Sequence, residues 1–392
     1  MAYTALVQHL ADTVDKDSAL LQAFNSAIAS SKQAAPDTYA DIETFADFLG
    51  FMDMFVTWVP RANPDVRVVD DVMHLLGKFH FVFDQDELRR LSQTWTTAGN
   101  VKEPIPWLAE WLVLYSRQMG VFMDSRQSLT KESLQTFCRR QDYHMEDYIE
   151  PPEGWSSFNH FFARHIKPEA RPIHGMADDT IVVSPADSCF AGSWPVDKDG
   201  YIELKHARWN VRTLLRGSKY QNDFDGGVFT HSFLNVNDYH RLHAPVAGKV
   251  LETMKMAGEV YLEVTVKDKK NVYTNVHVGS VPGELGVLDG EDHQWFQMRG
   301  LLILDSPIGL VAVIAVGMAQ IASVMITAQE GRQLHKGEEI CYFQFGGSDV
   351  VLVFQKNSNV GFTAQVTTPP AHYKVGQKIA QARPEARSSI IM

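Results

Sequence analysis

A serine beside a pair of glycines is the clearest candidate for chemistry in this chain. Ser348 follows Gly346 and Gly347 in the stretch FQFGGSD, with strand-like sequence on both sides. The glycines allow positive φ and predict a tight turn that leaves the carbonyl of Gly347 uncovered. Attack by the Ser348 hydroxyl would form an ester there, and elimination of that ester would cut the chain and leave a pyruvoyl group on residue 348. An ordinary hairpin turn is the alternative interpretation.

The stretch NVNDYHRLHAP could supply a base for this attack. It brings Asp238, His240 and His243 together within six residues, and Asp187 in VVSPADS is a further carboxylate. Histidine can take a serine proton near neutral pH, and a carboxylate can fix the tautomer of the ring. The alternatives are solvated surface histidines or half of a metal site, because H-x-x-H places both rings on one face of a helix. We predict no metal, since no carboxylate or cysteine cluster completes a ligand set.

Four stretches in collinear order, from about residue 158 to about residue 355, resemble the phosphatidylserine decarboxylase family of pyruvoyl enzymes. FNHFFARHIKPEARPI is similar to its F-x-x-F-F-x-R…R-P-I opening, and VVSPADS to its S-P-A-D-G. NDYHRLHAPVAGKV is similar to D-Y-H-R-x-H-x-P-x-x-G, and KGEEICYFQFGGSD to K-G-x-E-x-G-x-F…G-S-T. The family resemblance implies a self-cleaving decarboxylase whose cofactor is made from the chain itself.

The resemblance also implies a role for each candidate residue. Cleavage between Gly347 and Ser348 would convert Ser348 into the pyruvoyl cofactor. His243 would be the base of self-cleavage, supported by Asp187 and Asp238, and His240 would serve the decarboxylation step. The pyruvoyl carbonyl would condense with a substrate amine and accept electrons as CO₂ leaves.

The sequence departs from the family motifs at several positions. Asp349 stands where Thr is usual, Cys341 and Ser188 where Gly is usual, and QMRG at 297–300 where N-E-R is usual. An unprocessed, non-catalytic protein is therefore one alternative.

A biotin-carrier-like binding module is an alternative of another class. Met254-Lys255-Met256 resembles the lysine hairpin of biotin carrier domains. In those carriers, however, the A-P-x-x-G-x-V strand lies several strands before the lysine turn, whereas Gly248 here precedes Met254 almost directly.

The substrate is expected to be a small molecule with an amino-acid head. A helical N-terminal region, the FGGS corner and the GM pair of VGMAQIAS resemble the fungal branch that decarboxylates L-tryptophan. This resemblance implies a free, aromatic amino acid as substrate. The alternative is phosphatidylserine, which would give phosphatidylethanolamine.

The elements that must position these residues form an α+β protein. Residues 1–150 have apolar side chains at helical spacing and predict a helical N-terminal domain. DYIEPPEGW ends that pattern, and residues 151–392 predict a mostly-β catalytic domain that opens with a short docking helix in SSFNHFFARHI. WNVRTLLRG is the main helix expected within it. The expected strands include TIVVS, GYIELK, GVFTHSFLNV, GKVLETM, VYLEVTV and GLLILD.

Composition and charge exclude several classes of protein. A net charge of −11 argues against binding to nucleic acid or anionic membranes, which require clustered Lys and Arg. Residues 308–326 are uncharged, but they are rich in Val and Ile and contain glycines, so two buried strands are expected in place of a membrane span. Three widely spaced cysteines indicate a reducing compartment, and with no visible targeting signal we expect a cytoplasmic protein without a membrane anchor. A homodimer is left open.

Overall fold

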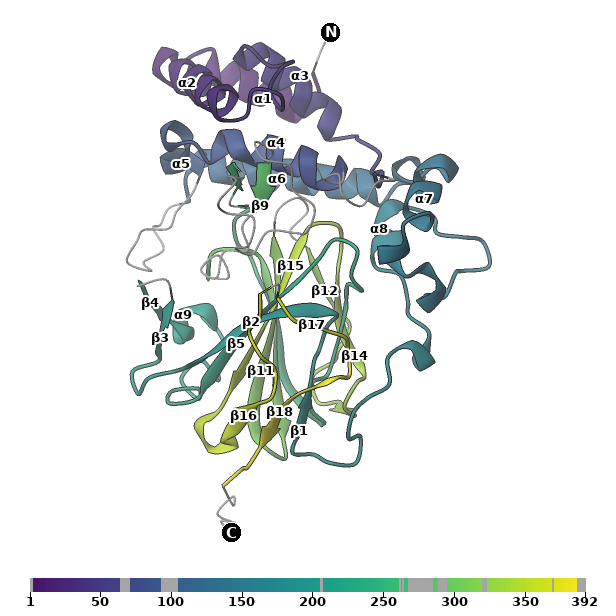
Figure 1. Ribbon diagram of the computed structural model, residues 1–392. Coiled ribbons are helices and arrows are strands. Elements are labelled where there is room, and N and C mark those ends of the chain that lie inside the picture. Colours follow the sequence, from purple (N-terminus) through teal and green to yellow (C-terminus); the bar gives the residue numbers. More distant parts are fainter. Residues whose placement is uncertain are drawn as a thin grey trace.

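The computed structural model describes residues 3–63, 71–92, 105–204, 207–260, 262, 264–266, 285–287, 295–318, 323–368 and 370–385. Helices dominate the first part of the chain and strands the second, which confirms the predicted α+β class (Figure 1). The helices are α1 (Ala5–Val14), α2 (Ser18–Ala34), α3 (Phe45–Phe55), α4 (Asp71–Phe83), α5 (Asp86–Ser92), α6 (Trp107–Met123), α7 (Lys131–Cys138), α8 (Phe158–Phe162) and α9 (Val211–Leu214).

An aromatic core holds the N-terminal helices together. The expected helical segments LVQHL, LLQAF and FADFLGFMDMFVTWV fall in α1, α2 and α3, and the apolar PWLAEWLVLYSRQMGVFM forms α6. α3 begins at a capping box in which Thr44 and Asp47 satisfy each other's backbone N–H groups. Phe79 of α4 stacks on Tyr115 of α6, with ring centroids 4.9 Å apart. The helices thus pack through large side chains at helical spacing.

The later part of the chain is built from antiparallel strands. They are β1 (Ile181–Val183), β2 (Ser188–Pro195), β3 (Tyr201–Leu204), β4 (Ala207–Asn210), β5 (Val228–Leu234), β6 (Arg241–His243), β7 (Gly248–Met256), β8 (Val264–Val266), β9 (Leu285–Val287), β10 (Arg299–Ser306), β11 (Gly309–Met318), β12 (Val324–Ile326), β13 (Gln333–Leu334), β14 (Glu339–Phe343), β15 (Gly347–Phe354), β16 (Val360–Phe362), β17 (His372–Tyr373) and β18 (Lys378–Ala382). An eight-stranded sheet has the order β13-β7-β10-β11-β15-β5-β2-β17. A smaller sheet, β12-β14-β6, carries the stretch that leads to Ser348.

The uncharged segment at 308–326 forms strands, as expected. It supplies β11, in which residues 311–316 are fully buried, and then β12. Within the described residues, no helix has both the length and the apolar character that crossing a bilayer requires.

The helical layer covers one end of the β domain. In Figure 1, α4 and α6 run across the end at which β9, β12 and β15 lie, and β16 and β18 lie toward the opposite end. β12 lies against the large sheet at Gly300, where an added Cβ would come within 2.7 Å of the Val324 side chain. The β12-β14-β6 sheet therefore packs on one face of the large sheet, close to the helices.

Candidate active site

Ser348 is the second residue of β15, and the predicted tight turn at this residue is wrong. It pairs with Leu234 of β5 and Gly317 of β11, so it lies inside the large sheet. The bend precedes it, at Gln344–Gly346, and Gly346 has φ of +153°, which glycine adopts far more readily than other residues. Pairing with strands that are distant in the sequence thus includes both Gly347 and Ser348 in β15.

His240 is the histidine that the structure brings to Ser348. Its Nδ1 lies 3.3 Å from the Ser348 Oγ, and its Nε2 lies 3.3 Å from the carbonyl oxygen of Val236. A neutral ring that donates from Nε2 presents the lone pair of Nδ1 to the serine hydroxyl. The ring also stacks on Phe162 of α8, with centroids 3.9 Å apart. This arrangement can remove a proton from Ser348.

Burial keeps the His240 ring uncharged. Its side chain is buried, and this burial, helped by the positive charge of Arg164, lowers the pKa of His240 to about 3. The imidazole is therefore neutral at neutral pH, which leaves Nδ1 as an acceptor for the serine hydroxyl, and the same burial makes the ring a weaker base than an exposed histidine.

His243 has other partners. Its Nε2 lies 2.9 Å from the Tyr239 hydroxyl, and its Nδ1 lies 2.7 Å from the carbonyl oxygen of Gly337. Burial lowers the pKa of His243. Among the described residues, neither ring nitrogen contacts Ser348. The geometry therefore favours His240 over His243 as the group that takes the serine proton.

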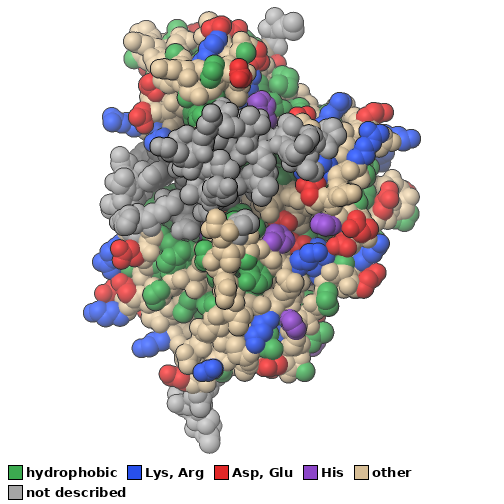
Figure 2. Space-filling model, in the orientation of Figure 1, with side chains coloured by type: hydrophobic (Ala, Val, Ile, Leu, Met, Phe, Trp, Pro, Cys, Tyr) green, Lys and Arg blue, Asp and Glu red, His purple; other side chains and the backbone are tan. Residues whose placement is uncertain are grey.

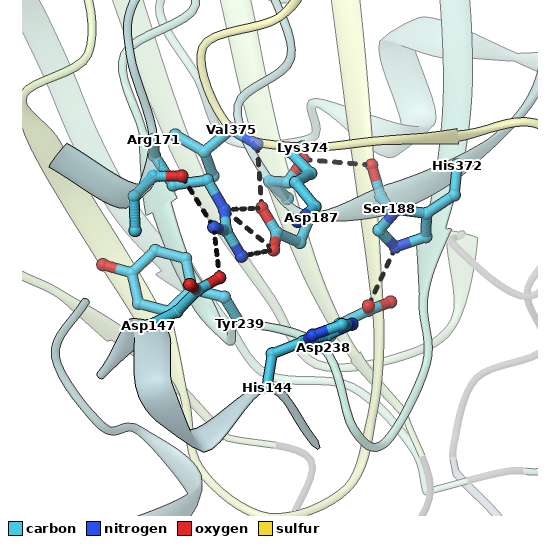
Figure 3. Close-up of polar contacts among 12 residues, drawn as sticks. His144, Asp147, Arg171, Asp187, Ser188, Asp238, Tyr239, His372, Lys374 and Val375 are labelled. Atoms are coloured by element: carbon cyan, nitrogen blue, oxygen red, sulfur yellow. Dashed lines mark hydrogen bonds and ion pairs between the residues drawn. The ribbon is translucent and has the colours of Figure 1, made fainter. Parts of the chain in front are cut away.

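Asp187 is held by an arginine (Figure 3). Arg171 donates from Nη2 to the Asp187 Oδ2 at 2.5 Å, and the Val375 backbone N–H donates to Oδ1 at 2.8 Å. Arg171 also bonds to Asp147 at 2.9 Å. Burial opposes the charge of Arg171, but its bonds to Asp187 and Asp147 raise its pKa. Asp187, which directly precedes β2, is thus joined to the segments that carry Arg171 and Val375.

Asp238 is paired with a histidine that the sequence did not single out. The His372 Nε2 lies 2.8 Å from the Asp238 Oδ1 (Figure 3). The Asn235 backbone N–H donates to the Asp238 Oδ2 at 2.7 Å. Burial lowers the pKa of His372, but the bond and charge of Asp238 outweigh it, so the pKa is raised. His372 is isolated in the sequence, and only the pairing of β17 with β2 brings it near the site.

Asp349 faces away from the serine hydroxyl. Successive strand residues point to opposite faces of a sheet, so the Asp349 carboxylate lies on the face opposite Ser348 Oγ. There it contacts the His231 Nε2 at 3.0 Å, and both side chains are buried. Asp349, which stands where Thr is usual in the family, thus forms a buried contact with a histidine on the face of the sheet behind the site.

Arg164 supports the segment before His240. Its Nη2 donates to the carbonyl oxygen of Asn237 at 3.0 Å, and its guanidinium lies 4.0 Å from the ring centre of Tyr148. Arg164 is the arginine of the F-x-x-F-F-x-R motif, and its place in that motif could have identified it as a site residue.

The lysine of the M-K-M sequence is not at a hairpin. Met254, Lys255 and Met256 lie within β7 and pair with β10, and Lys255 Nζ lies 3.7 Å from the Met325 Sδ. The biotin-carrier interpretation is therefore unsupported, because a carrier lysine needs an exposed turn. The described residues also contain no cluster of three or more His, Cys, Asp or Glu side chains able to hold a metal ion.

Comparison with known proteins identifies the family. The family model for phosphatidylserine decarboxylase matches residues 158–381, more than half of the chain. The chain belongs to the phosphatidylserine decarboxylase family. Homologues in this family are decarboxylases, and the proenzymes among them depend on a pyruvoyl group formed from a serine by self-cleavage, which agrees with the enzyme class and cofactor predicted from the sequence.

Individual relatives differ in length from this member of the family. Phosphatidylserine decarboxylase proenzyme 3 of Schizosaccharomyces pombe is 32% identical over 241 residues, which cover 61% of this chain and 23% of that protein. The proenzyme of Ruminiclostridium cellulolyticum is 28% identical over 268 residues, covering 68% and 82%. Decarboxylase iboD of Amanita muscaria is 31% identical over 238 residues, covering 58% and 66%. The chain thus spans about a quarter of the length of the S. pombe relative and 32% of that of an Oryza sativa relative.

Proposed function

We propose that this chain is a proenzyme that cuts itself between Gly347 and Ser348 and then decarboxylates a free amino acid, with L-tryptophan first among the candidates. The observation that carries the self-cleavage is the 3.3 Å contact between Ser348 Oγ and His240 Nδ1, next to the bend that ends at Gly346. The substrate rests on the resemblance to the fungal branch and on the net charge of −11. Acidic residues are repelled by an anionic bilayer, where each basic residue contributes about 1 kcal/mol of attraction.

Self-cleavage needs only groups of the chain and one water. His240 takes the Ser348 proton while Oγ attacks the Gly347 carbonyl carbon, and the peptide C–N bond breaks as the amide nitrogen gains a proton. The ester so formed loses the Cα proton of residue 348, and Gly347 leaves as a carboxylate. Water then replaces the nitrogen of the dehydrated residue, which releases ammonia and leaves the pyruvoyl carbonyl.

The residues around position 348 fit such a group. Its backbone is held between β11 and β5, and the neighbouring Gly317 adds no side chain. The pyruvoyl group supplies an electron sink for a substrate amine that has condensed with it. His240 lies where a proton must be moved near that carbonyl, and the stack on Phe162 keeps its ring in place. Burial of the site excludes bulk water from the reacting atoms.

Phosphatidylserine is the second candidate substrate, because the names of most relatives are those of phosphatidylserine decarboxylases. On the face of the molecule that Figure 2 shows, the described Lys and Arg side chains are interspersed with Asp and Glu. The described part of this face therefore offers no continuous basic surface to a membrane. The three cysteines are free thiols, which fits a reducing compartment, and the cytoplasm is our proposed location.

Mass spectrometry and a substrate panel test the proposal. The purified chain should give two fragments, the smaller comprising residues 348–392, and the Ser348→Ala chain should stay whole. The cut protein should release CO₂ from free amino acids, tested beside phosphatidylserine vesicles, with cyanoborohydride trapping of the substrate amine on the small fragment. A wild-type chain that stays whole would support the non-catalytic alternative, and turnover of vesicles alone would replace the proposed substrate.

A further inference from the structure

A pocket of about 350 Å³ lies between the helical layer and the β domain. That volume is at the lower end of the range for small-molecule sites, so the pocket suits one small molecule better than two acyl chains. It is lined by Val113, Ser116, Arg117, Gly120, Val121 and Asp124, from α6 and its C-terminal cap, and by Ala257, Gly258, Val260, Met298, Ser323 and Gln344 from the β domain.

The pocket opens on the same face of the large sheet as the Ser348 hydroxyl. Met298 directly precedes β10, and its carbonyl oxygen accepts a hydrogen bond from the Gly317 N–H of β11 at 2.9 Å. On the other side of β11, Gly317 pairs directly with Ser348 of β15. Residues directly opposite one another on neighbouring strands project to one face. Met298 and Ser348 therefore share a face, about 10 Å apart across two strand spacings. Gly317 places no side chain between them.

The chain segment before the cleavage point also lines the pocket. Gln344 lies four residues before Ser348, and its Nε2 donates to the Asp124 Oδ1 at 3.1 Å. The Asn159 Nδ2 donates to the same oxygen at 2.9 Å. Among the described residues, no donor reaches the other oxygen, Oδ2, of this exposed carboxylate. The helix macrodipole disfavours an acid at a helix C-terminus, so Asp124 is not placed there to stabilise α6.

We infer that this pocket receives the side chain of the substrate and that Asp124 accepts a hydrogen bond from its far end. The inference rests on the proposed function, which places the substrate amine at residue 348. Val113, Val121, Val260 and Met298 offer apolar walls, and the Asp124 carboxylate offers an acceptor. The preferred substrates are therefore amino acids with a bulky apolar side chain that ends in an N–H or O–H donor, as in tryptophan and tyrosine.

Direct binding tests the pocket without the reaction. Tryptamine is titrated by calorimetry into the uncut Ser348→Ala chain and into the same chain with Val121→Trp, which enlarges a 74% exposed side chain at the pocket rim. The Kd should rise at least about tenfold, because the indole loses its space. Leu114→Trp, at a 49% exposed position of α6 that does not line the pocket, is the matched control and should leave the Kd unchanged. No binding to the parent chain, or an equal Kd with Val121→Trp, would overturn the inference.

Turnover by the cut enzyme tests the role of Asp124. Asp124→Asn keeps one oxygen for Gln344 and Asn159 but replaces the other acceptor by an NH₂ donor. The ratio of kcat/KM for L-tryptophan to that for L-phenylalanine should fall about tenfold or more, since only tryptophan has the donor. An unchanged ratio in an enzyme that decarboxylates tryptophan would overturn the role of Asp124 and leave the proposed function intact. An enzyme that turns over phosphatidylserine vesicles alone would overturn the proposed substrate, and the tryptamine titration would then judge the pocket by itself.

Discussion

At the scale of single residues, His240 and His243 can be separated by substitution. His240→Ala should leave the chain whole, since loss of a general base typically slows a reaction about 10²–10⁴-fold. His243→Ala should still be cut, because its ring contacts Tyr239 and Gly337. Intact-mass time courses of the two variants measure this. Cutting of His240→Ala, with His243→Ala remaining whole, would restore His243 as the base that the family resemblance implies.

The sequence located this histidine pair but could not distinguish its members. On a helix, H-x-x-H would place both rings on one face, whereas in an extended chain an odd separation turns them to opposite sides. The segment is extended into β6, so His240 faces Ser348 and His243 faces Tyr239. His372, the partner of Asp238, comes from a distant segment, and no local pattern indicates it. Arg171, the partner of Asp187, belongs to the R-P-I motif, but the sequence did not indicate its pairing with Asp187.

A buried histidine in the helical layer should make the protein sensitive to acid. The His80 Nε2 is buried and has no hydrogen-bond partner among the described residues, and burial lowers the pKa of His80 to about 3. In the unfolded chain His80 binds a proton below about pH 6.5, whereas in the folded protein it stays neutral down to about pH 3. The free energy of unfolding therefore decreases as the pH falls from about 6.5 toward 3. His80→Leu should therefore reduce the loss of unfolding free energy between pH 7 and pH 5 by on the order of 2 kcal/mol.

Urea unfolding at the two pH values measures this effect, in the Ser348→Ala background so that every chain is intact. His9→Leu, at an exposed position of α1, is the control and should leave the pH dependence unaltered. Equal acid sensitivity of His80→Leu and its parent would show that His80 is already protonated in the folded protein.

At the scale of elements, α8 connects the helical layer to the cleavage segment. The buried Asn159 accepts a hydrogen bond from the Phe345 N–H at 3.0 Å and donates to Asp124 at 2.9 Å. Asn159→Ala leaves a buried N–H unsatisfied, which costs about 1–3 kcal/mol, and frees the segment before Gly347. Self-cleavage should slow about tenfold, since the attack needs the carbonyl held in place.

A time course of fragment formation, well below the melting temperature, measures this slowing. Ser156→Ala, which removes an exposed hydroxyl just before the same helix, is the matched control and should be cut at the parent rate. An Asn159→Ala chain cut as fast as its parent would show that the bend is held without this bond.

Most elements could be predicted from hydrophobic periodicity, and the failures have a common cause. The segments GKVLETM and GLLILD form strands as expected, whereas the helix expected in WNVRTLLRG is restricted to Val211–Leu214 because Trp209 pairs with β3. Ser348 was placed at a turn on its glycines, but pairing with β5 and β11 extends the strand through it. Those partners are distant in the sequence, and local propensity does not include them.

At the scale of the whole molecule, the part of the chain after the cleavage point is interleaved with the part before it. β15 lies between β11 and β5 in the large sheet, β17 forms its edge, and β18 pairs with both β1 and β16 in a separate sheet. After cutting, these strands should remain bound, since their hydrogen bonds and buried side chains do not depend on the Gly347–Ser348 bond.

Refolding should therefore differ between the cut protein and the intact chain. When both are unfolded in urea and diluted, the Ser348→Ala chain should regain its fold to the same extent at any protein concentration. The cut protein should recover less as the concentration falls, because two separate chains must meet. Near-UV circular dichroism over a dilution series measures recovery. Concentration-independent recovery of the cut protein would show that the large fragment folds alone.

Because β15 lies in the middle of the large sheet, self-cleavage both activates the enzyme and removes its ability to refold as a single chain. Before the cut, the whole sequence that determines the fold lies in one chain, and an unfolded copy can refold by itself. Afterwards that sequence is divided between two chains that the cell has no means of rejoining, because the serine that formed the junction has been consumed. The working lifetime of each enzyme is then set by the rate at which it first unfolds. That rate depends on the activation barrier to unfolding and not on the equilibrium free energy of unfolding.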